Sequence, residues 1–336
     1  MLKIGLAGFS QGYYAVTYMR YLVTKPQVTC VGICDLGASE EYVKECAFTT
    51  AEKFAKELKA PLFTKFEDLL DTGLDALLVC SETHLHVELA AQALAKGIHV
   101  FVSKPLSFDL KDFELLNSAS EEAILLCGNP LRYQEDILQF ATQIQEGGVG
   151  KPYAMNATIC HQAMIHQEWE RDPARSGSNL GTYSPYLFDL ANWIIGEKLV
   201  SIFARGGNYN TPQIDPEDTL HISGQLACGG LCFVELHSGI NQPHPFFKAE
   251  VVGTRDWLSV VYEDNEASSS GDKDIVDLGF IQEGDPGALE MDHFLDCIEK
   301  GEAPGCSMAD MKYTVACVEA VKKSLISGQQ EPVEEG

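Results

Sequence analysis

Short apolar runs alternate with helical stretches over the first 127 residues of the chain. The apolar runs are continuous, as in strands that are buried on both faces of a parallel sheet. Amphipathic segments lie between them at residues 50–60 and 86–97, and Gly97 ends the second one in a position typical of a helix C-cap. This alternation predicts a doubly wound α/β domain. Its strands are expected at residues 3–7, 28–34, 75–80, 99–103 and 123–127.

From residue 128 onward the pattern changes to long alternating runs separated by glycine-rich turns. Runs at 200–209, 220–226, 231–237 and 247–262 predict a mixed or antiparallel sheet. Amphipathic helices are expected around 288–301 and 308–328. The pattern therefore divides the chain into a domain over 1–127 and an α/β domain over 128–336. A large sheet covered by helices on one face leaves the other face for a subunit interface, so we expect a homodimer or homotetramer.

Charge and hydropathy limit the kinds of molecule that the chain is expected to bind. The chain has 24 Lys plus Arg against 49 Asp plus Glu, a net charge of −25, which would repel a nucleic-acid backbone and anionic lipid. No apolar run approaches the roughly 20 residues of a membrane helix. The N-terminus runs directly into a strand pattern without a signal-peptide arrangement, so we expect a cytoplasmic protein that binds a small molecule.

The 11 cysteines stand mostly in apolar strands, where a thiol behaves as a small hydrophobic group. Cys228 and Cys232 are spaced like a metal-binding pair, but no second pair lies near them in sequence. Buried free thiols are the favoured interpretation, and no metal is expected.

The first strand is followed by the turn "IGLAGFSQGYYA". In a doubly wound fold ligands bind at the carboxyl ends of the strands, and a helix N-terminus there can hold a pyrophosphate. Against the G-x-G-x-x-G pattern, Ser10 replaces the second glycine and Tyr13 the third, although serine is small enough for a phosphate to approach the backbone. A plain strand-to-helix turn is the alternative. The dinucleotide loop would comprise Gly8, Phe9, Ser10, Gln11 and Gly12.

The second strand ends on Asp35, whose carboxylate can accept hydrogen bonds from both hydroxyls of an adenosine ribose. No arginine follows it to balance a 2′-phosphate. This favours NAD over NADP. The alternative is an aspartate that is merely exposed in a loop.

The fourth apolar run ends on Lys104, followed at once by Pro105. Lysine is seldom buried without a partner, and proline cannot donate to a sheet ladder, so the strand stops here. An amine at the carboxyl end of a parallel strand can hydrogen-bond a substrate hydroxyl and stabilise a developing alkoxide. A solvated lysine at a strand end is the alternative.

The segment "LDALLVCSETHLHVELAAQALAKGIHVFVSKPLS" resembles the Gfo/Idh/MocA oxidoreductases. Ser81 and Glu82 replace the family's Thr-Pro, and Ser103 replaces the glutamate of its Glu-Lys-Pro. The resemblance implies a Rossmann domain, then an α/β domain with a large, mostly antiparallel sheet. It also implies NAD(P)-dependent hydride transfer to or from a sugar, polyol or related compound. Positions in register are Asp75, His86, Gly97, His99, Val100, Lys104 and Pro105, and the cofactor residues it implies include Ser81, Glu82, His86, Lys104 and Pro105.

The family's second domain carries an Asp-x-x-x-His motif that handles the substrate proton. Registering "SGSNLGTYSPYLFDLANWIIGE" on Asp189, Asn192 and Trp193 puts Thr182 at the aspartate and Tyr186 at the histidine. Two hypotheses follow. The chain is a dehydrogenase with Lys104 and the tyrosine as catalytic residues, or it is a catalytically silent NAD(P)-binding regulatory or ligand-binding protein.

Candidate substrate residues lie in two further segments. Asn129 and Arg132 resemble the family's Asn-x-x-Arg turn, and the segment before Tyr186 offers hydrogen-bond donors, an aromatic ring and positive charge. A salt-bridged loop is the alternative there, and a zinc site on two of its histidines stays open. The sequence does not identify the substrate. The candidates in and around this segment are His161, His166, Trp169, Arg171, Arg175, Thr182 and Tyr186.

Overall fold

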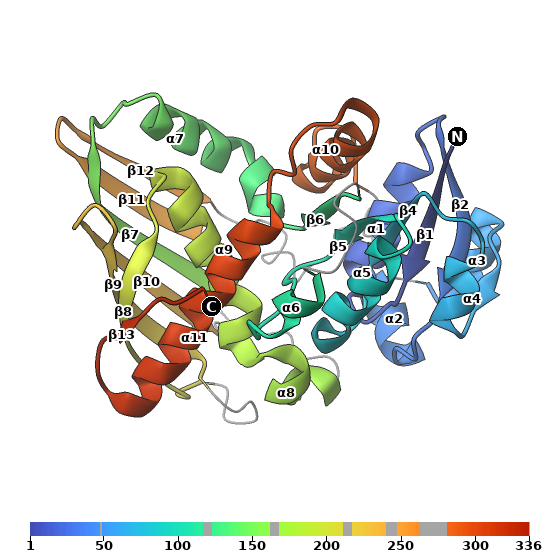
Figure 1. Ribbon diagram of the computed structural model, residues 1–336, viewed down its shortest axis with the longest axis horizontal. Helices are drawn as coiled ribbons and strands as arrows, with labels where there is room; N and C mark the ends of the chain where they lie inside the picture. Colours follow the sequence, from blue (N-terminus) through green and yellow to red (C-terminus); the bar gives the residue numbers. More distant parts are fainter. Residues whose placement is uncertain are drawn as a thin grey trace, which may run out of the picture. The chain divides into compact units, whose positions relative to one another are not determined.

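The computed structural model describes residues 1–47, 49–116, 123–161, 168–210, 217–239, 247–262 and 281–335 (Figure 1). The chain forms two compact units. The first comprises Met1–Ser107, Lys111–Pro130 and Asp274–Met308, and the second comprises Phe108–Leu110, Leu131–Lys273 and Ala309–Gly336. The stretch Lys111–Pro130 ends three residues beyond the boundary expected at 127, and a later segment of the chain returns to the first unit.

The first unit is built on a six-stranded sheet in the order β3-β2-β1-β4-β5-β6, in which all neighbouring strands are parallel. This is the strand order of a dinucleotide-binding Rossmann domain, so the doubly wound prediction is confirmed. The strands are β1 (Leu2–Ala7), β2 (Val28–Cys34), β3 (Leu62–Phe63), β4 (Ala76–Val79), β5 (His99–Val102) and β6 (Leu125–Cys127). The helices are α1 (Gly12–Leu22), α2 (Glu40–Ala47), α3 (Ala51–Leu58), α4 (Phe66–Leu70), η1 (Thr83–Leu85), α5 (His86–Leu94), α6 (Asp112–Leu116) and α10 (Pro286–Lys300).

Helix α10 comes from far along the chain but packs on α1. Its Phe294 ring meets Phe101 of β5 edge-on, with 5.8 Å between ring centroids, and Phe101 meets Tyr18 of α1 in the same way at 5.6 Å. Phe101 and Phe294 are fully buried. The core of the Rossmann unit therefore includes a helix that the sequence pattern assigned to the second half.

The second unit is built on a seven-stranded sheet in the order β12-β11-β7-β10-β9-β8-β13. Only the β7–β10 pair is parallel, so the prediction of a large, mostly antiparallel sheet is confirmed. The strands are β7 (Pro152–His161), β8 (Leu199–Gly207), β9 (Thr219–Leu226), β10 (Leu231–Ser238), β11 (Phe247–Gly253), β12 (Trp257–Tyr262) and β13 (Glu331–Pro332). The remaining helices are η2 (Pro130–Tyr133), α7 (Glu135–Gln145), η3 (Glu168–Arg171), α8 (Pro173–Ser176), α9 (Ser178–Ile195) and α11 (Met308–Ser327).

Two details of this sheet differ from the pattern. The alternating run over 247–262 is a hairpin of β11 and β12, closed where Gly253 N donates to Asp256 O at 2.9 Å. Strand β7, which the pattern left unassigned, pairs with both β10 and β11. Alternation of apolar and polar residues indicates a strand, but it does not show where a turn divides the run.

Helices α7, α9 and α11 lie on one face of the seven-stranded sheet (Figure 1). Their apolar side chains form one core with the alternate buried positions of the strands, including Leu187 of α9, Val318 of α11 and Leu236 of β10. The intervening positions point to the opposite face, which we call the bare face, and several of them are exposed. Among the described residues, no helix is both long and apolar enough to cross a bilayer.

Candidate functional site

The predicted cofactor residues follow the carboxyl ends of the parallel strands. Gly8 follows β1, Asp35 follows β2 and Ser81 lies two residues after β4. Lys104 lies two residues after β5, and Asn129 two residues after β6. Since the strands are parallel, these positions share one edge of the sheet, and the β1–β4 neighbourhood is its topological switch point.

Gly8 makes the turn at the centre of this edge. Its φ of +86° is accessible to glycine, and a Cβ there would lie 2.7 Å from the Cα of Ser81. Its N–H donates to Cys34 O at 2.9 Å, which ties the turn to β2. The turn brings the start of α1 to the strand ends, where backbone N–H groups can hold an anion.

The other residues of this turn have separate roles. Phe9 is fully buried and meets Phe54 edge-on at 6.1 Å, so its side chain belongs to the core. Ser10 is 5% exposed. Gln11 donates from Nε2 to Lys104 O at 3.0 Å, and its buried Oε1 has no hydrogen-bond partner in the structure. The Gln11 side chain thus links the phosphate turn to the lysine.

Asp35 lies just beyond β2, partly exposed, with Oδ1 accepting a hydrogen bond from Gly37 N at 3.0 Å. Its own N–H donates to Phe63 O at 2.9 Å, which fixes the backbone at the strand end. The following residues are Leu36, Gly37, Ala38 and Ser39, which bring no positive charge.

The backbone around Lys104 is held from several sides. Ser103, which replaces the family's glutamate, is 1% exposed and donates from Oγ to Val79 O at 3.0 Å. The Lys104–Pro105 peptide bond is cis, and the side chain of Lys104 is partly exposed. Lys104 thus lies in a turn that is hydrogen-bonded to β4 through Ser103 and to the residue before α1 through Gln11.

His86, a predicted cofactor residue, is completely buried. Its Nδ1 lies 2.8 Å from Pro105 O and its Nε2 lies 3.0 Å from Ser81 O. Burial lowers the pKa of His86 to about 4, so the ring is neutral at pH 7. His86 therefore joins the turn after β4 to the turn after β5. Of its neighbours in the motif, Glu82 lies 3.4 Å from His84 Nδ1.

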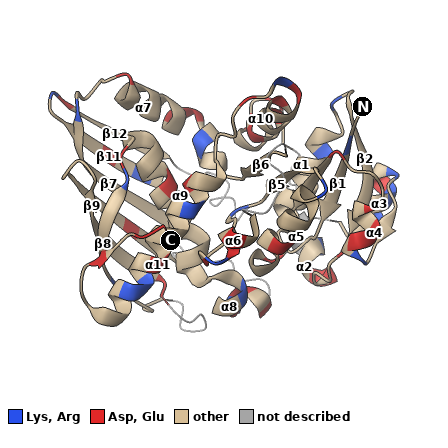
Figure 2. Cartoon of the chain, in the orientation of Figure 1, with Lys and Arg blue, Asp and Glu red and all other residues tan. Residues whose placement is uncertain are grey.

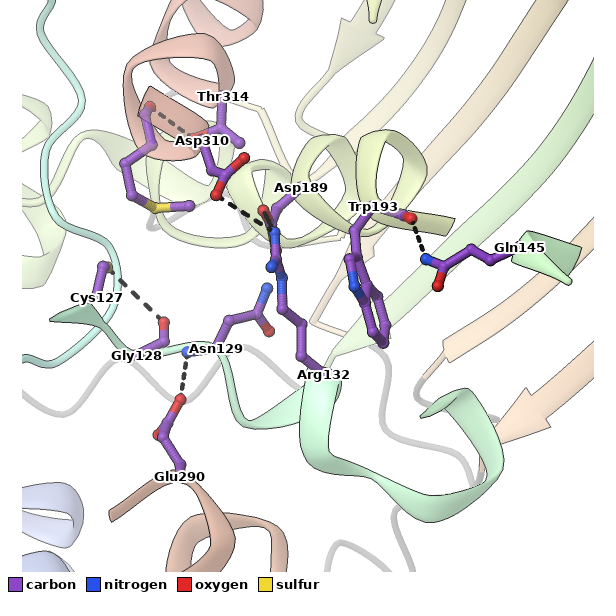
Figure 3. A network of polar contacts seen from close by, with 11 residues as sticks. Cys127, Gly128, Asn129, Arg132, Gln145, Asp189, Trp193, Glu290, Asp310 and Thr314 are labelled. Atoms are coloured by element: carbon purple, nitrogen blue, oxygen red, sulfur yellow. Dashed lines mark hydrogen bonds and ion pairs between the residues drawn. The ribbon is translucent and has the colours of Figure 1, made fainter. Parts of the chain in front are cut away.

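An acid that the sequence analysis missed lies beneath Asn129 (Figure 3). Glu290 of α10 is fully buried, accepts from Asn129 N at Oε1 over 2.6 Å and from Tyr18 Oη at Oε2 over 2.8 Å. Burial raises the pKa of Glu290 to about 8. The only signal was an acidic residue at an apolar position of the helix "ALEMDHFLDCIEKG".

In the second unit the predicted residues gather on one face of α9. Thr182, Tyr186, Asp189 and Trp193 are spaced i, i+4, i+7 and i+11, which places them on one helical stripe. Asp189 had served only to align the sequence. In the structure it is 1% exposed and accepts two hydrogen bonds from Arg132, at 2.8 Å from Nε and 2.5 Å from Nη2 (Figure 3).

Arg132 is therefore held by several groups of its own unit. Its guanidinium also lies 4.0 Å from Asp310 and 5.3 Å from the ring centroid of Trp193. Gln145 of α7 donates to Trp193 O at 2.7 Å. The bidentate pair accounts for the Arg132 side chain, and direct contact with a substrate stays a prediction.

Tyr186 is 4% exposed and lies within the apolar core of the second unit. Thr182 Oγ1 donates to Ser176 O at 3.4 Å. His161 ends β7, and its ring lies against Tyr183, with 4.4 Å between centroids and 32° between planes. Tyr183 was missed by the sequence analysis because it lies beside, not on, the motif positions.

The other candidates of this segment differ in their burial. His166 lies outside the described residues. Trp169 is 6% exposed, while Arg171 is exposed on η3 and Arg175 is partly buried on α8.

Comparisons with known proteins match both units. Residues 2–128 match the family model of the oxidoreductase family with an NAD-binding Rossmann fold, and residues 137–259 match that of the GFO/IDH/MocA C-terminal domain. The chain is 23% identical over 309 residues to scyllo-inositol 2-dehydrogenase (NAD(+)) of Bacillus subtilis, covering 87% of this chain and 84% of that protein. It is 27% identical over 283 residues to myo-inositol 2-dehydrogenase of Thermotoga maritima, covering 79% and 81%.

Among solved structures, GenD2 from gentamicin A biosynthesis in complex with NAD superposes with a TM-score of 0.82 at 18% identity, over 99% of this chain and 96% of that one. The parallel sheet and its glycine turn define an NAD-binding Rossmann domain of the oxidoreductase class. The chain belongs to the Gfo/Idh/MocA family, as the resemblance implied.

Proposed function

We propose that this protein is an NAD-dependent dehydrogenase that transfers hydride between the nicotinamide and a hydroxyl or carbonyl carbon of a sugar, polyol or related substrate. The observation that carries the proposal is the gathering of Gly8, Asp35 and Lys104 at one carboxyl edge of the Rossmann sheet. The named relatives, two inositol dehydrogenases, support the substrate class.

The residues present fit the dinucleotide. The Gly8 turn packs directly against Ser81 and leads the chain into α1, whose first backbone N–H groups could hold a diphosphate. The Gln11 amide, with one buried oxygen unused, can turn toward a ligand. Asp35 would hold the adenosine ribose, and the lack of Lys or Arg at residues 36–39 favours NAD over NADP.

When bound, NAD would supply the hydride acceptor. Lys104 would donate a hydrogen bond to the substrate oxygen and stabilise its negative charge as the carbon loses hydride. Tyr186 would take the hydroxyl proton. A phenol has an ordinary pKa near 10, so Tyr186 needs a nearby positive charge to act as a base at neutral pH.

The second candidate function is an NAD-binding protein without turnover. It is favoured by the burial of Tyr186 and by the replacement of the family's Asp-x-x-x-His pair by Thr182 and Tyr186. Cofactor binding is common to both functions, so only substrate-dependent turnover separates them.

The experiment is a titration of NADH and NADPH followed by a turnover screen with inositols, sugars and aromatic diols. Asp35→Ala should weaken NADH binding by about 1–3 kcal/mol, the range for a charged hydrogen bond. Lys104→Met should keep the melting temperature and NADH affinity while losing most of kcat, because it removes a contact made in the transition state. Tighter binding of NADPH by the wild type, or an unchanged kcat in Lys104→Met, would contradict the assignment.

The oligomer and the compartment are parts of the same proposal. The bare face carries exposed apolar side chains, among them Leu231, Phe233 and Trp257, together with charges of both signs such as Arg205 and Glu235. Such a face can pair with a second copy about a two-fold axis, giving a homodimer or homotetramer. None of the ten cysteines whose side chains the structure describes forms a disulfide, which fits the reducing cytoplasm.

A further inference from the structure

Three side chains with metal-ligand chemistry meet on the bare face of the second unit. His221 lies on β9, and Glu235 and His237 lie on β10. Glu235 is directly opposite His221 in the antiparallel ladder, and His237 is two residues further along the same strand. The strand period of two therefore puts all three on one face. None belongs to the dinucleotide edge or to the α9 stripe.

The distances between the nitrogen and oxygen atoms of these side chains are close to those within a metal site. His221 Nδ1 lies 3.1 Å from Glu235 Oε1, and His237 Nε2 lies 3.8 Å from Glu235 Oε2. All three ligand atoms lie within 4.8 Å of one another. Ligand atoms bonded to a tetrahedral zinc at about 2.0–2.2 Å are roughly 3.4 Å apart from one another. Small side-chain rotations therefore suffice to bring all three ligand atoms to coordination distance.

The carboxylate is also held from a third strand. Thr158 of β7, opposite Glu235 in the parallel ladder, donates from Oγ1 to Glu235 Oε2 at 3.3 Å. Hydrogen bonds of this kind orient metal-ligating carboxylates. The two imidazole rings lie 5.7 Å apart at 82° to each other, so they converge on the carboxylate without stacking. Three paired strands thus fix the ligand positions more firmly than a loop would.

We infer that His221, Glu235 and His237 bind one divalent transition-metal ion of the zinc type, with water in the remaining coordination position. Two imidazoles and one carboxylate suit zinc, cobalt, nickel or copper, whereas magnesium and calcium prefer a shell of oxygen atoms. The net charge of −25 favours cation binding. The site takes no part in the proposed hydride transfer, so zinc binding and turnover can be tested independently.

The test is calorimetric titration of the chelator-treated full chain with Zn²⁺ at pH 7.5, with Mg²⁺ in parallel. The wild type should bind one zinc with a dissociation constant in the micromolar range or below. The double variant His221→Gln, His237→Gln should lose at least 100-fold in affinity. Thr158→Val, which keeps the shape of the side chain, should lose roughly 10-fold because the carboxylate is no longer oriented.

Two controls separate the site from other donors. His84→Gln removes an exposed histidine whose Nδ1 lies 3.4 Å from Glu82, outside the three-residue cluster, and should bind zinc as the wild type does. Cys160→Ser removes the thiol opposite His237 on β7 and should also bind normally. Circular dichroism of each variant should match that of the wild type. Unchanged zinc affinity in the double variant, loss of binding in Cys160→Ser, or magnesium binding as tight as zinc would overturn the inference.

Discussion

At the scale of single residues, the proposed turnover depends on the hydroxyl of Tyr186. Removing only that hydroxyl, in Tyr186→Phe, should lower kcat by roughly 10² to 10⁴, the range for a general acid or base, while the packing in the core is kept. Tyr186→His should recover part of the activity with a lower pH optimum, because imidazole titrates near neutrality. Steady-state kinetics over pH with a confirmed substrate measure both.

The buried position of Tyr186 also allows a purely structural role, as expected for a residue between Pro185 and Leu187. If Tyr186→Phe has full activity, the proton relay lies elsewhere, with His161 or His166 as the next candidates. The melting temperature of Tyr186→Phe serves as the control, since the phenyl ring fills the same space.

Glu290 predicts a specific pH dependence of stability. Its pKa is raised by burial from about 4.5 to about 8 in the folded protein, so the folded state keeps a proton that the unfolded state releases above pH 4.5. The stabilisation from this group is complete below pH 4.5 and is lost as the pH rises toward 8, with a slope of up to about 1.4 kcal/mol per pH unit.

Glu290→Gln is the matched variant, because an amide can accept from Asn129 N and donate to Tyr18 Oη. Urea denaturation at each pH measures the difference in unfolding free energy between the wild type and the variant. This difference should decrease as the pH rises from 5 to 8. A constant difference across that range would mean that Glu290 is already ionised at pH 5 in the folded protein.

At the scale of elements, the Arg132–Asp189 pair fixes α9 to the segment η2. Asp189→Asn removes the charge of the bidentate partner, leaves Arg132 beside the more distant Asp310 carboxylate at 4.0 Å, and should cost about 3–5 kcal/mol of unfolding free energy. The double variant Arg132→Met, Asp189→Leu should recover most of that loss, since it removes both charges together. Denaturant unfolding of the three variants measures this, with Thr142→Val on exposed α7 as the control. An unfolding free energy of Asp189→Asn close to that of the wild type would contradict a structural role for the pair.

The elements show which parts of the fold the sequence could predict. Continuous apolar runs such as β1 and β4 were found because a strand buried on both faces has no other pattern. The β11–β12 hairpin was not separated, and β7 was missed, because alternation alone does not show where a run turns or which neighbours it pairs with. The partners of Arg132 and Glu290 could not be predicted either, since each contact joins positions distant in sequence.

Some features of the candidate site could likewise be predicted from the sequence, and others could not. The common location of Gly8, Asp35 and Lys104 could be predicted because each follows an apolar run, and parallel strands bring such positions to one edge. Phe9 and His86 were assigned to the cofactor from the motif, and both side chains are buried in the protein. A sequence position next to a ligand does not reveal which way the side chain points.

At the scale of the whole molecule, the charge distribution and the bare face bear on assembly. Acidic side chains occur on helices of both units (Figure 2), in keeping with the excess of Asp and Glu. On the bare face, Phe233 is 38% exposed in the middle strand of the sheet. If a second copy covers this face, Phe233→Glu should place a buried charge there and shift the protein to a smaller species.

Light scattering coupled to size exclusion measures that shift. Leu138→Glu, a similar change on the exposed side of α7, should leave the mass unchanged. A wild type that is monomeric at micromolar concentration, or a Leu138→Glu variant that dissociates while Phe233→Glu does not, would refute the use of this face for assembly.

Helix α10 has a consequence for how the protein is made. The Rossmann core includes Phe294 and the buried acid Glu290, yet about 170 residues separate them from β6 along the chain. At ribosomal rates of about 5–20 residues per second, that stretch takes roughly 8–34 seconds to synthesise. During this interval the nascent Rossmann sheet has all six of its strands, but the positions of α1 that contact α10 are uncovered. Folding of the first unit is therefore completed late in translation, after most of the second unit has left the ribosome.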